Sequence, residues 1–569
     1  MRVGKGRTQV LSPYLIKGSW PSLVSPLLVL RLHTAALASK GFCSRIGRES
    51  SNGITNLRVS KKNFALAVFS GLFLFLSFPK YGSGIMAWVA LIPLFFALKD
   101  AQPREALKIG FLAGFVAHIG ILYWIAYVVV QYGYLPIYAG IAAMLLLAAY
   151  LSLYTACFAL GIVFLGAKGI RIFLSAPLLW TVLEFLRSHL LTGFPWENLA
   201  YSQYLYAKVI QISDITGLYG ITFAIVMINA ALYGLVSARF RGQYLLVETV
   251  VACLAIVMII VYGHYRIENI DALLKKTPSM NVALIQGNID QNMKWNPLYQ
   301  SQTIDIYRSL SRQAVPSGGG LIVWPETAAP FYFQQRNAMQ EAVVDVARAS
   351  GSALLFGSPS YEEENGRIAY MNSAFLLKPD GTVSGRYDKV HLVPYGEYVP
   401  LRRFFPFIGK LVAGVGDFKP GKGFYPLTSD GRRLGVLICY EGILPEAARD
   451  YKREKAEILV NITNDAWFGK TSAPYQHLSM TVFRAVENRL YLVRAANTGI
   501  SAIIDPKGEI LSRTGIFERT ILNGDIKIID EKTCYAAYGD AFVYLCAIAL
   551  IIITISTTRR RKKHAGRNS

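Results

Sequence analysis

The chain has 569 residues, of which 53% are apolar and only 17% charged, and its formal net charge is +23. Soluble domains carry about 25% charged residues, so this composition disfavours a purely soluble chain and excludes a disordered one. Residues 265–537 hold 32 Lys and Arg against 28 Asp and Glu, which leaves 59 − 32 = 27 against 36 − 28 = 8 elsewhere. Because the basic excess lies between apolar runs, it indicates membrane topology, and we expect no nucleic-acid partner.

Residues 1–60 form a basic N-terminal extension in which Glu49 is the sole acidic residue. Its apolar patch at 21–30 is interrupted by Pro26 and is too short to span a bilayer. A disordered extension, a misassigned start and a cleaved targeting segment all fit this composition.

About eight apolar runs are long enough, or nearly so, to cross a hydrocarbon core of roughly 30 Å. They lie at 62–79, 84–98, 107–130, 135–166, 172–190, 218–238, 244–263 and 538–556. The pattern predicts a polytopic bundle of seven spans over 61–265, an eighth transmembrane helix at 538–556 and a basic tail at 557–569. The first two runs are expected to pair as a hairpin around Pro79 to Gly84.

Every second connection between these runs is basic. The basic residues are Lys61, Lys62, Lys99, Arg104, Lys108, Lys168, Arg171, Arg239, Arg241 and the tail from Arg559. The connection at 131–135 has no charge. Under the positive-inside rule, this alternation predicts cytoplasmic termini and places the segment after the seventh span on the opposite side.

Residues 278–530 have a different pattern, in which short β-branched runs alternate with helical stretches. The expected strands are 281–285, 321–324, 353–356, 434–438 and 457–461, and the expected helices include 340–349 and 479–488. Strands that alternate with helices predict a layered α/β domain large enough for its own core.

Polar side chains follow three of the expected strands, where layered α/β domains place their chemistry. Glu326, Lys389 and Cys439 together offer a base, a cation and a thiol, which covalent acyl transfer requires. Each alone has a plainer interpretation: Glu326 as a helix N-terminal anion, Lys389 as a surface charge and Cys439 as a small buried hydrophobe.

The remaining cysteines and histidines suggest no further chemistry. Cys157, Cys253 and Cys546 fall inside apolar runs, so the six cysteines form no disulfide framework. His391 and His477 lack the spacing of a metal site. We expect neither a metal nor a cofactor.

The aromatic loop at 193–203 has two interpretations. Trp196 and Tyr201 could hold it at headgroup depth as an interfacial anchor, or it could form the floor of a lipid-binding cleft beneath the outer domain.

Several ordered motifs carry a resemblance to known proteins. They are Gly193-Phe-Pro-Trp196, Gln286-Gly-Asn288, Met293-Lys-Trp295, Trp324-Pro-Glu326, residues 388–400, Cys439-Tyr-Glu441 and residues 464–469. With these residues the chain resembles the nitrilase superfamily, whose Glu–Lys–Cys triad lies in an αββα sandwich. Within its membrane frame, from about residue 62 to 556, it resembles more closely the bacterial apolipoprotein N-acyltransferases.

The resemblance implies a role for each triad member: Glu326 as general base, Lys389 as oxyanion stabiliser and Cys439 as nucleophile. It also implies a set of supporting residues, namely Glu397, Tyr440, Glu441, Trp295, Trp467 and Asn372.

The reaction that the resemblance implies is the last step of lipoprotein maturation. A phospholipid, through the sn-1 chain of phosphatidylethanolamine, would acylate Cys439. The thioester would then acylate the α-amine of the diacylglyceryl-cysteine of an apolipoprotein. The implied location is the bacterial inner membrane, with the catalytic domain in the periplasm.

Two features leave alternatives open. Residues 398–418 are typical of an amphipathic arm that dips into the interface, although a helix packed on the domain also fits. The same triad would serve a membrane-tethered amidase with water as acceptor, and a transporter or receptor would use the outer domain only for binding. The few ionisable residues in the spans, among them His118, Glu184 and Arg187, disfavour transport.

Overall fold

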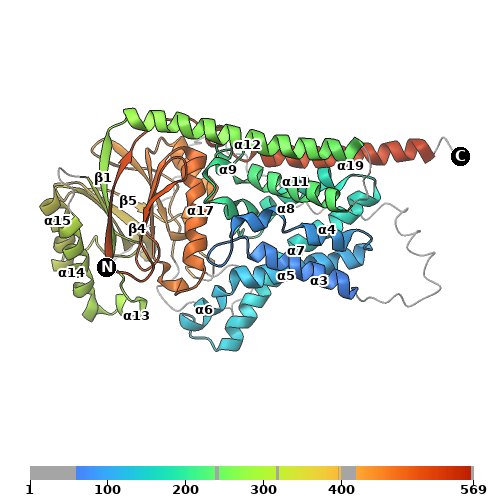
Figure 1. The fold of residues 1–569 in the computed structure, drawn as a ribbon. Coiled ribbons are helices and arrows are strands. Elements are labelled where there is room, and N and C mark those ends of the chain that lie inside the picture. Colours follow the sequence, from blue (N-terminus) through green and yellow to red (C-terminus); the bar gives the residue numbers. More distant parts are fainter. Residues whose placement is uncertain (1–58, 238–242, 315–319, 395, 399–417, 566–569) are drawn as a thin grey trace, which may run out of the picture. The chain divides into compact units, whose positions relative to one another are not determined.

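The computed structural model describes residues 59–569 except 238–242, 315–319, 395, 399–417 and 566–569. Nearly all of the predicted N-terminal extension, and most of the predicted arm at 398–418, lie outside the described residues. The described part consists of a helical bundle and a two-sheet α/β sandwich (Figure 1).

The bundle is built from apolar helices that follow the predicted runs along the chain. They are α3 (Lys61–Phe75), η1 (Gly84–Trp88), α4 (Ile92–Leu98), α5 (Pro103–Leu122), α6 (Trp124–Gln131), α7 (Ile137–Ala167), α8 (Ile172–His189), α11 (Leu218–Val236), α12 (Gln243–Lys276) and α19 (Ala541–Ala565). Short helices η2 (Leu199–Gln203), α9 (Ala207–Ile210) and α10 (Ser213–Thr216) connect α8 to α11.

Five helices in the described part are long and apolar enough to cross a membrane: 103–122, 137–167, 218–236, 244–276 and 541–559. The predicted run at 107–130 is divided at Tyr123 into α5 and α6. Helix α3 has 15 residues, and α8 contains the polar residues Glu184, Arg187 and His189. The count of eight spans therefore stays a prediction.

The first two predicted runs do form a hairpin. Helix α3 is joined to η1 and α4 by a turn in which Ser83 N–H donates to Leu76 O at 2.8 Å. The Ser70 hydroxyl of α3 donates to Ala90 O, just before α4, at 2.7 Å. Since both hydroxyl and carbonyl are buried, this hydrogen bond removes an unpaired polar group from an apolar environment.

The sandwich has two six-stranded sheets with the orders β12-β1-β2-β3-β4-β5 and β11-β10-β9-β8-β7-β6. The strands are β1 (Ser279–Gln286), β2 (Leu321–Val323), β3 (Ala353–Glu364), β4 (Arg367–Leu377), β5 (Val383–Asp388), β6 (Leu427–Ser429), β7 (Arg432–Ile438), β8 (Ile458–Thr463), β9 (Tyr491–Ala496), β10 (Ala502–Ile504), β11 (Ile510–Arg513) and β12 (Thr520–Lys527). The neighbours β1-β2-β3 and β7-β8-β9 are parallel. Glu326 follows the end of β2, and Cys439 follows the end of β7. All five predicted strands are present, and the predicted α/β fold is confirmed.

Helices cover the outer faces of both sheets. They are α13 (Gln291–Lys294), α14 (Pro297–Ala314), α15 (Ala338–Ser350), α16 (Pro445–Arg453) and α17 (Ala473–Asn488), with the short helices η3 (Cys439–Ile443), η4 (Asp465–Phe468) and α18 (Cys534–Tyr538). Helix α15 buries one apolar face, begins at the N-cap Asn337 and ends at Gly351 with φ +58°. Both predicted helices are confirmed, as parts of α15 and α17.

Helix α17 differs from α15 because it is covered on both sides. Every residue from Ala473 to Asn488 except Tyr475 is buried. Figure 1 shows α17 between the sheets and the bundle. Gln476 of this helix accepts hydrogen bonds from the indole N–H groups of Trp124 (3.2 Å) and Trp196 (2.9 Å), which belong to the bundle.

A second junction follows the end of α17. The buried guanidinium of Arg489 lies 2.6 Å from an Asp214 carboxylate oxygen and donates to Gln211, both from the connection between α8 and α11. Arg266 of α12 contacts the same carboxylate at 2.9 Å. These buried charges join the sandwich to the bundle, and each retains a partner.

We expect Arg489→Met to destabilise the protein by about 3–5 kcal/mol, because it leaves Asp214 buried with one cation fewer. Thermal unfolding in detergent would measure this. The control is Arg348→Met, since the side chains of Arg348 and Glu341 are half exposed and such a pair contributes about 0–1 kcal/mol. Equal losses from the two variants would contradict this account of the junction.

Candidate active site

The three predicted catalytic residues lie just beyond the ends of β2, β5 and β7. Asn372 of β4 connects two carboxylates, because its side-chain amide donates to Glu326 Oε1 at 2.8 Å and to Glu397 Oε1 at 3.0 Å. Glu397 in turn pairs with Lys389, with 2.8 Å between Oε2 and Nζ. The chain thus brings Glu326, Lys389 and two of the predicted supporting residues into one cluster.

Lys389 is a fully buried cation, with 1% of its surface exposed. Burial alone would lower its pKa, but the Glu397 carboxylate, with Cys439 and Glu326 nearby, raises it above the ordinary value. Lys389 is therefore charged at neutral pH, as an oxyanion-stabilising residue must be.

Cys439 begins η3 directly after β7 and adopts a left-handed backbone with φ +54°. Non-glycine residues seldom adopt this conformation, and it is typical of functional sites. Burial and the Glu326 carboxylate raise the pKa of the Cys439 thiol, and Lys389 opposes that rise. The thiol is thus protonated at neutral pH and needs a base to become a nucleophile.

Glu441 connects the segment of Lys389 to that of Cys439. Its buried carboxylate accepts hydrogen bonds from the backbone N–H groups of Val390 (2.7 Å), His391 (3.0 Å) and Ile438 (2.8 Å). The Tyr387 hydroxyl donates to the same group at 3.0 Å. Glu441 therefore holds these two segments together.

Tyr440 links the site to the bundle. Its ring stacks on Trp196 at 6.5 Å and on His391 at 5.8 Å, with interplanar angles of 17° and 18°. Trp196 and Tyr201 are buried, at 2% and 0% exposure, so the 193–203 loop does not offer them to lipid as interfacial anchors. The loop lies beneath the active site instead.

The two predicted supporting tryptophans lie at the edge of this region. Trp467 packs edge-on against Tyr132 of the bundle, at 4.8 Å between ring centroids. Trp295 follows α13 and is 37% exposed. Their roles in acyl-chain binding stay predictions.

Lys294 belongs to the motif Met293-Lys-Trp295 but had no predicted role, and the structure places it beside Glu326. Its ammonium is 2% exposed and donates to the Glu326 carbonyl at 3.0 Å. Burial lowers the pKa of Lys294 to about 8, although Glu326 opposes this. Asn464, the first residue of the motif 464–469, likewise had no predicted role, and its backbone N–H donates to Glu326 Oε2 at 2.9 Å. No local pattern distinguishes this lysine from a surface charge.

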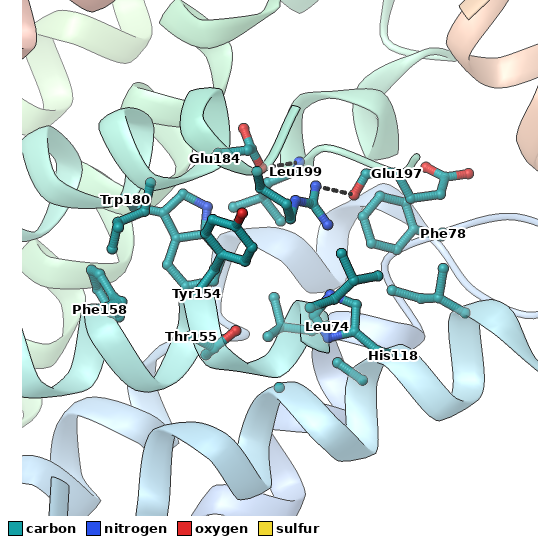
Figure 2. A pocket seen from close by; sticks show the side chains of 16 residues that line it. Leu74, Phe78, His118, Tyr154, Thr155, Phe158, Trp180, Glu184, Glu197 and Leu199 are labelled. Atoms are coloured by element: carbon teal, nitrogen blue, oxygen red, sulfur yellow. Dashed lines mark hydrogen bonds between the residues drawn. The ribbon is translucent and has the colours of Figure 1, made fainter. Parts of the chain in front are cut away.

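A cavity within the bundle adjoins the 193–203 loop, and Figure 2 shows the side chains that line it. Glu184 accepts from Leu199 N–H at 2.7 Å, and Arg187 donates to the Glu197 carbonyl. The cavity volume of about 60 Å³ has room for a few water molecules, each needing roughly 10–15 Å³. The ionisable residues of α8 therefore hold the loop in place, and His118 lines the same cavity as a buried polar residue.

The fold and site define a carbon–nitrogen hydrolase domain joined to a membrane bundle. The carbon–nitrogen hydrolase family model matches residues 281–532, and the model of the apolipoprotein N-acyltransferase N-terminal domain matches 70–231. The crystal structure of an amidase from Nesterenkonia sp. matches 47% of this chain and 95% of that chain, with 24% identity and a TM-score of 0.35.

Whole-length relatives identify the family. The apolipoprotein N-acyltransferase of Geobacter metallireducens is 45% identical over 89% of this chain and 97% of that protein. The Pasteurella multocida protein of the same name is 31% identical over 87% of this chain and 96% of its own length. The chain belongs to the apolipoprotein N-acyltransferase family.

The electrostatics of the site predict opposite effects of two substitutions on the Cys439 thiol. Glu326→Gln removes a charge that raises the thiol pKa, so the pH curve for alkylation by iodoacetamide should move to lower pH. Lys389→Met removes a charge that lowers the pKa, so the curve should move to higher pH. The rates would be measured by mass spectrometry of the Cys439 peptide, and curves that coincide with that of the unsubstituted protein would contradict the assignment.

Proposed function

We propose that the protein moves an acyl chain from a membrane phospholipid to the N-terminal amine of an apolipoprotein, through a thioester on Cys439. The observation that carries this proposal is the cluster of Glu326, Lys389 and Cys439 at three strand ends. Family membership supports the acyl-transfer chemistry and the lipoprotein acceptor. The phospholipid donor and the residue roles are our inference.

In the first half-reaction, Glu326 takes the proton of the Cys439 thiol, and the sulfur attacks the carbonyl carbon of the sn-1 ester. Lys389 neutralises the oxyanion that forms. Removing one such donor typically lowers the rate about 10²- to 10³-fold. The C–O bond then breaks, the lysophospholipid leaves with the proton held by Glu326, and an acyl group remains on sulfur.

In the second half-reaction, the α-amine of the diacylglyceryl-cysteine attacks the thioester carbonyl. Glu326 accepts the amine proton, the C–S bond breaks and the Cys439 thiol is restored, as a ping-pong cycle requires. The amide that forms completes the lipoprotein. Phosphatidylethanolamine is the donor we favour, and water in place of the amine would make the same site a hydrolase.

The bundle provides access to both substrates. Each buried CH₂ group is worth about 0.8 kcal/mol, so neither lipid leaves the bilayer readily. Stacking of Tyr440 on Trp196 supports a site that lies next to the membrane part of the chain. The predicted amphipathic arm at 398–418, most of which lies outside the described residues, would dip into the interface.

We infer a bacterial inner-membrane enzyme with cytoplasmic termini and a periplasmic catalytic domain. Its bundle covers 61–265, its catalytic domain 278–530, its last span 538–556 and its tail 557–569. Lys168, after α7, donates to Thr558 of α19 at 3.2 Å. This contact supports placing the connection after α7 and the basic tail on the same side of the membrane. Asn63 of α3 donates to Glu105 of α5 at 3.1 Å, so the basic starts of these helices also adjoin.

Purified protein given labelled phospholipid and no acceptor should form a hydroxylamine-sensitive acyl adduct. Cys439→Ala should abolish the adduct, and Glu326→Gln should slow its formation at least about 100-fold, within the usual range for general-base catalysis. The control is Cys534→Ala, which removes an exposed cysteine and should change nothing. Absence of an adduct would favour a binding or transport protein, and equal discharge by water and lipopeptide would favour a hydrolase.

Single cysteines introduced into an otherwise cysteine-free chain would test the topology. An impermeant maleimide applied to spheroplasts should label Tyr134→Cys, at an exposed residue in the uncharged connection. It should label Lys99→Cys only after the membrane is permeabilised. Labelling in the reverse order would overturn the proposed orientation.

A further inference from the structure

A buried polar cluster lies behind Cys439 and takes no part in the mechanism above. Asp465, His477 and Arg494 are each at most 1% exposed. They come from η4, α17 and β9, three elements of the second sheet layer. Burying two charged groups and an imidazole is costly unless all are paired, so the contacts of the cluster are informative.

The imidazole of His477 bridges this cluster and the nucleophile. Its Nε2 lies 3.2 Å from the Cys439 carbonyl oxygen, and its Nδ1 lies 3.0 Å from both Asp465 Oδ1 and Arg494 Nη2. The Asn461 side-chain amide donates to the same carbonyl at 3.3 Å. The carbonyl of the nucleophile therefore has two buried donors.

The contact with the Cys439 carbonyl determines the hydrogen on Nε2 of His477. A carbonyl oxygen only accepts, so Nε2 carries a hydrogen and donates it to Cys439. Burial and the Arg494 guanidinium lower the pKa of His477, while Asp465 opposes that change. Nδ1 lies next to a closed ion pair, because Arg494 Nη2 is 2.8 Å from the Asp465 carboxylate.

The backbone of Cys439 needs this support. At φ +54° it occupies the left-handed region, which a non-glycine residue keeps only when its surroundings over-determine it. Rotation of the 439–440 peptide would displace both the thiol and the Tyr440 ring that follows. Hydrogen bonds to the carbonyl oppose that rotation.

We propose that His477 is a positioning residue for the nucleophile. By donating to the Cys439 carbonyl, it holds the thiol toward Glu326 and Lys389. Because the adjacent Gln476 bonds Trp124 and Trp196, α17 also couples the orientation of the thiol to the bundle. This inference deepens the proposed function, and only its acyl-adduct measurement rests on that function.

The test compares His477→Phe, which removes the donor but keeps a ring, with His477→Gln, whose amide can restore a donor near Nε2. We expect the phenylalanine variant to form the acyl adduct at least about tenfold more slowly with KM for phospholipid within about twofold, since small displacements of reacting groups cost up to 10²-fold. The glutamine variant should recover to within about threefold. Thr481→Val is the control, because it removes a buried hydrogen bond to the His477 carbonyl on the same helix without touching Cys439.

Two results would overturn the proposal: an adduct rate within twofold of the unsubstituted protein for His477→Phe, or a folded His477→Gln variant that remains tenfold slow. If the phenylalanine variant fails to fold, the glutamine variant decides by itself. Iodoacetamide alkylation of Cys439 separates this proposal from the proposed function, because it needs no lipid. Slower alkylation in His477→Phe, with Thr481→Val unchanged, would support positioning even if no acyl adduct formed, and equal rates would count against it.

Discussion

The carboxylate of Glu441 lies buried between the two chain segments that carry Lys389 and Cys439, and it accepts hydrogen bonds from both. A buried carboxylate is costly to desolvate, and backbone N–H groups directed at it offset much of that cost. Those same hydrogen bonds fix the end of β7 and the turn after β5 relative to each other. The relative placement of Lys389 and Cys439 thus depends on the Glu441 carboxylate that lies between their segments.

The other buried charges at the site also have partners that position them. Lys389 is paired with Glu397, which shares Asn372 with Glu326. Burial and the Glu326 carboxylate raise the pKa of the Cys439 thiol and Lys389 opposes them, so the thiol is protonated at neutral pH.

Helix α17 connects the α/β sandwich of the carbon–nitrogen hydrolase type to the bundle, because it contacts both parts of the chain. Its buried face toward the sheets carries His477, and its neighbour Gln476 contacts two bundle tryptophans. Trp196 also stacks on Tyr440, the residue after Cys439. The loop at 193–203 therefore forms part of the support for the active site, and the Glu184 and Arg187 side chains of α8 hold that loop.

Much of the fold could be predicted because burial patterns are local. The short apolar, β-branched run at 281–285 or 434–438 predicts a strand without knowledge of its neighbours, and polar residues after such strands predict the site. Strand β9 was missed because Arg494 interrupts its apolar run, and this arginine is tolerated through its pair with Asp465. Lys294 and the donor role of His477 depend on partners 32 and 38 residues away, which no local pattern reveals.

The central claim is that Cys439 carries the acyl group between two lipid substrates. The most direct measurement is the amount of lysophospholipid released when protein and phospholipid are mixed rapidly without apolipoprotein. The account predicts a burst of about one equivalent per Cys439 that then stops, and resumes when a lipopeptide acceptor is added. Steady release without acceptor, or the same burst from Cys439→Ala, would contradict it.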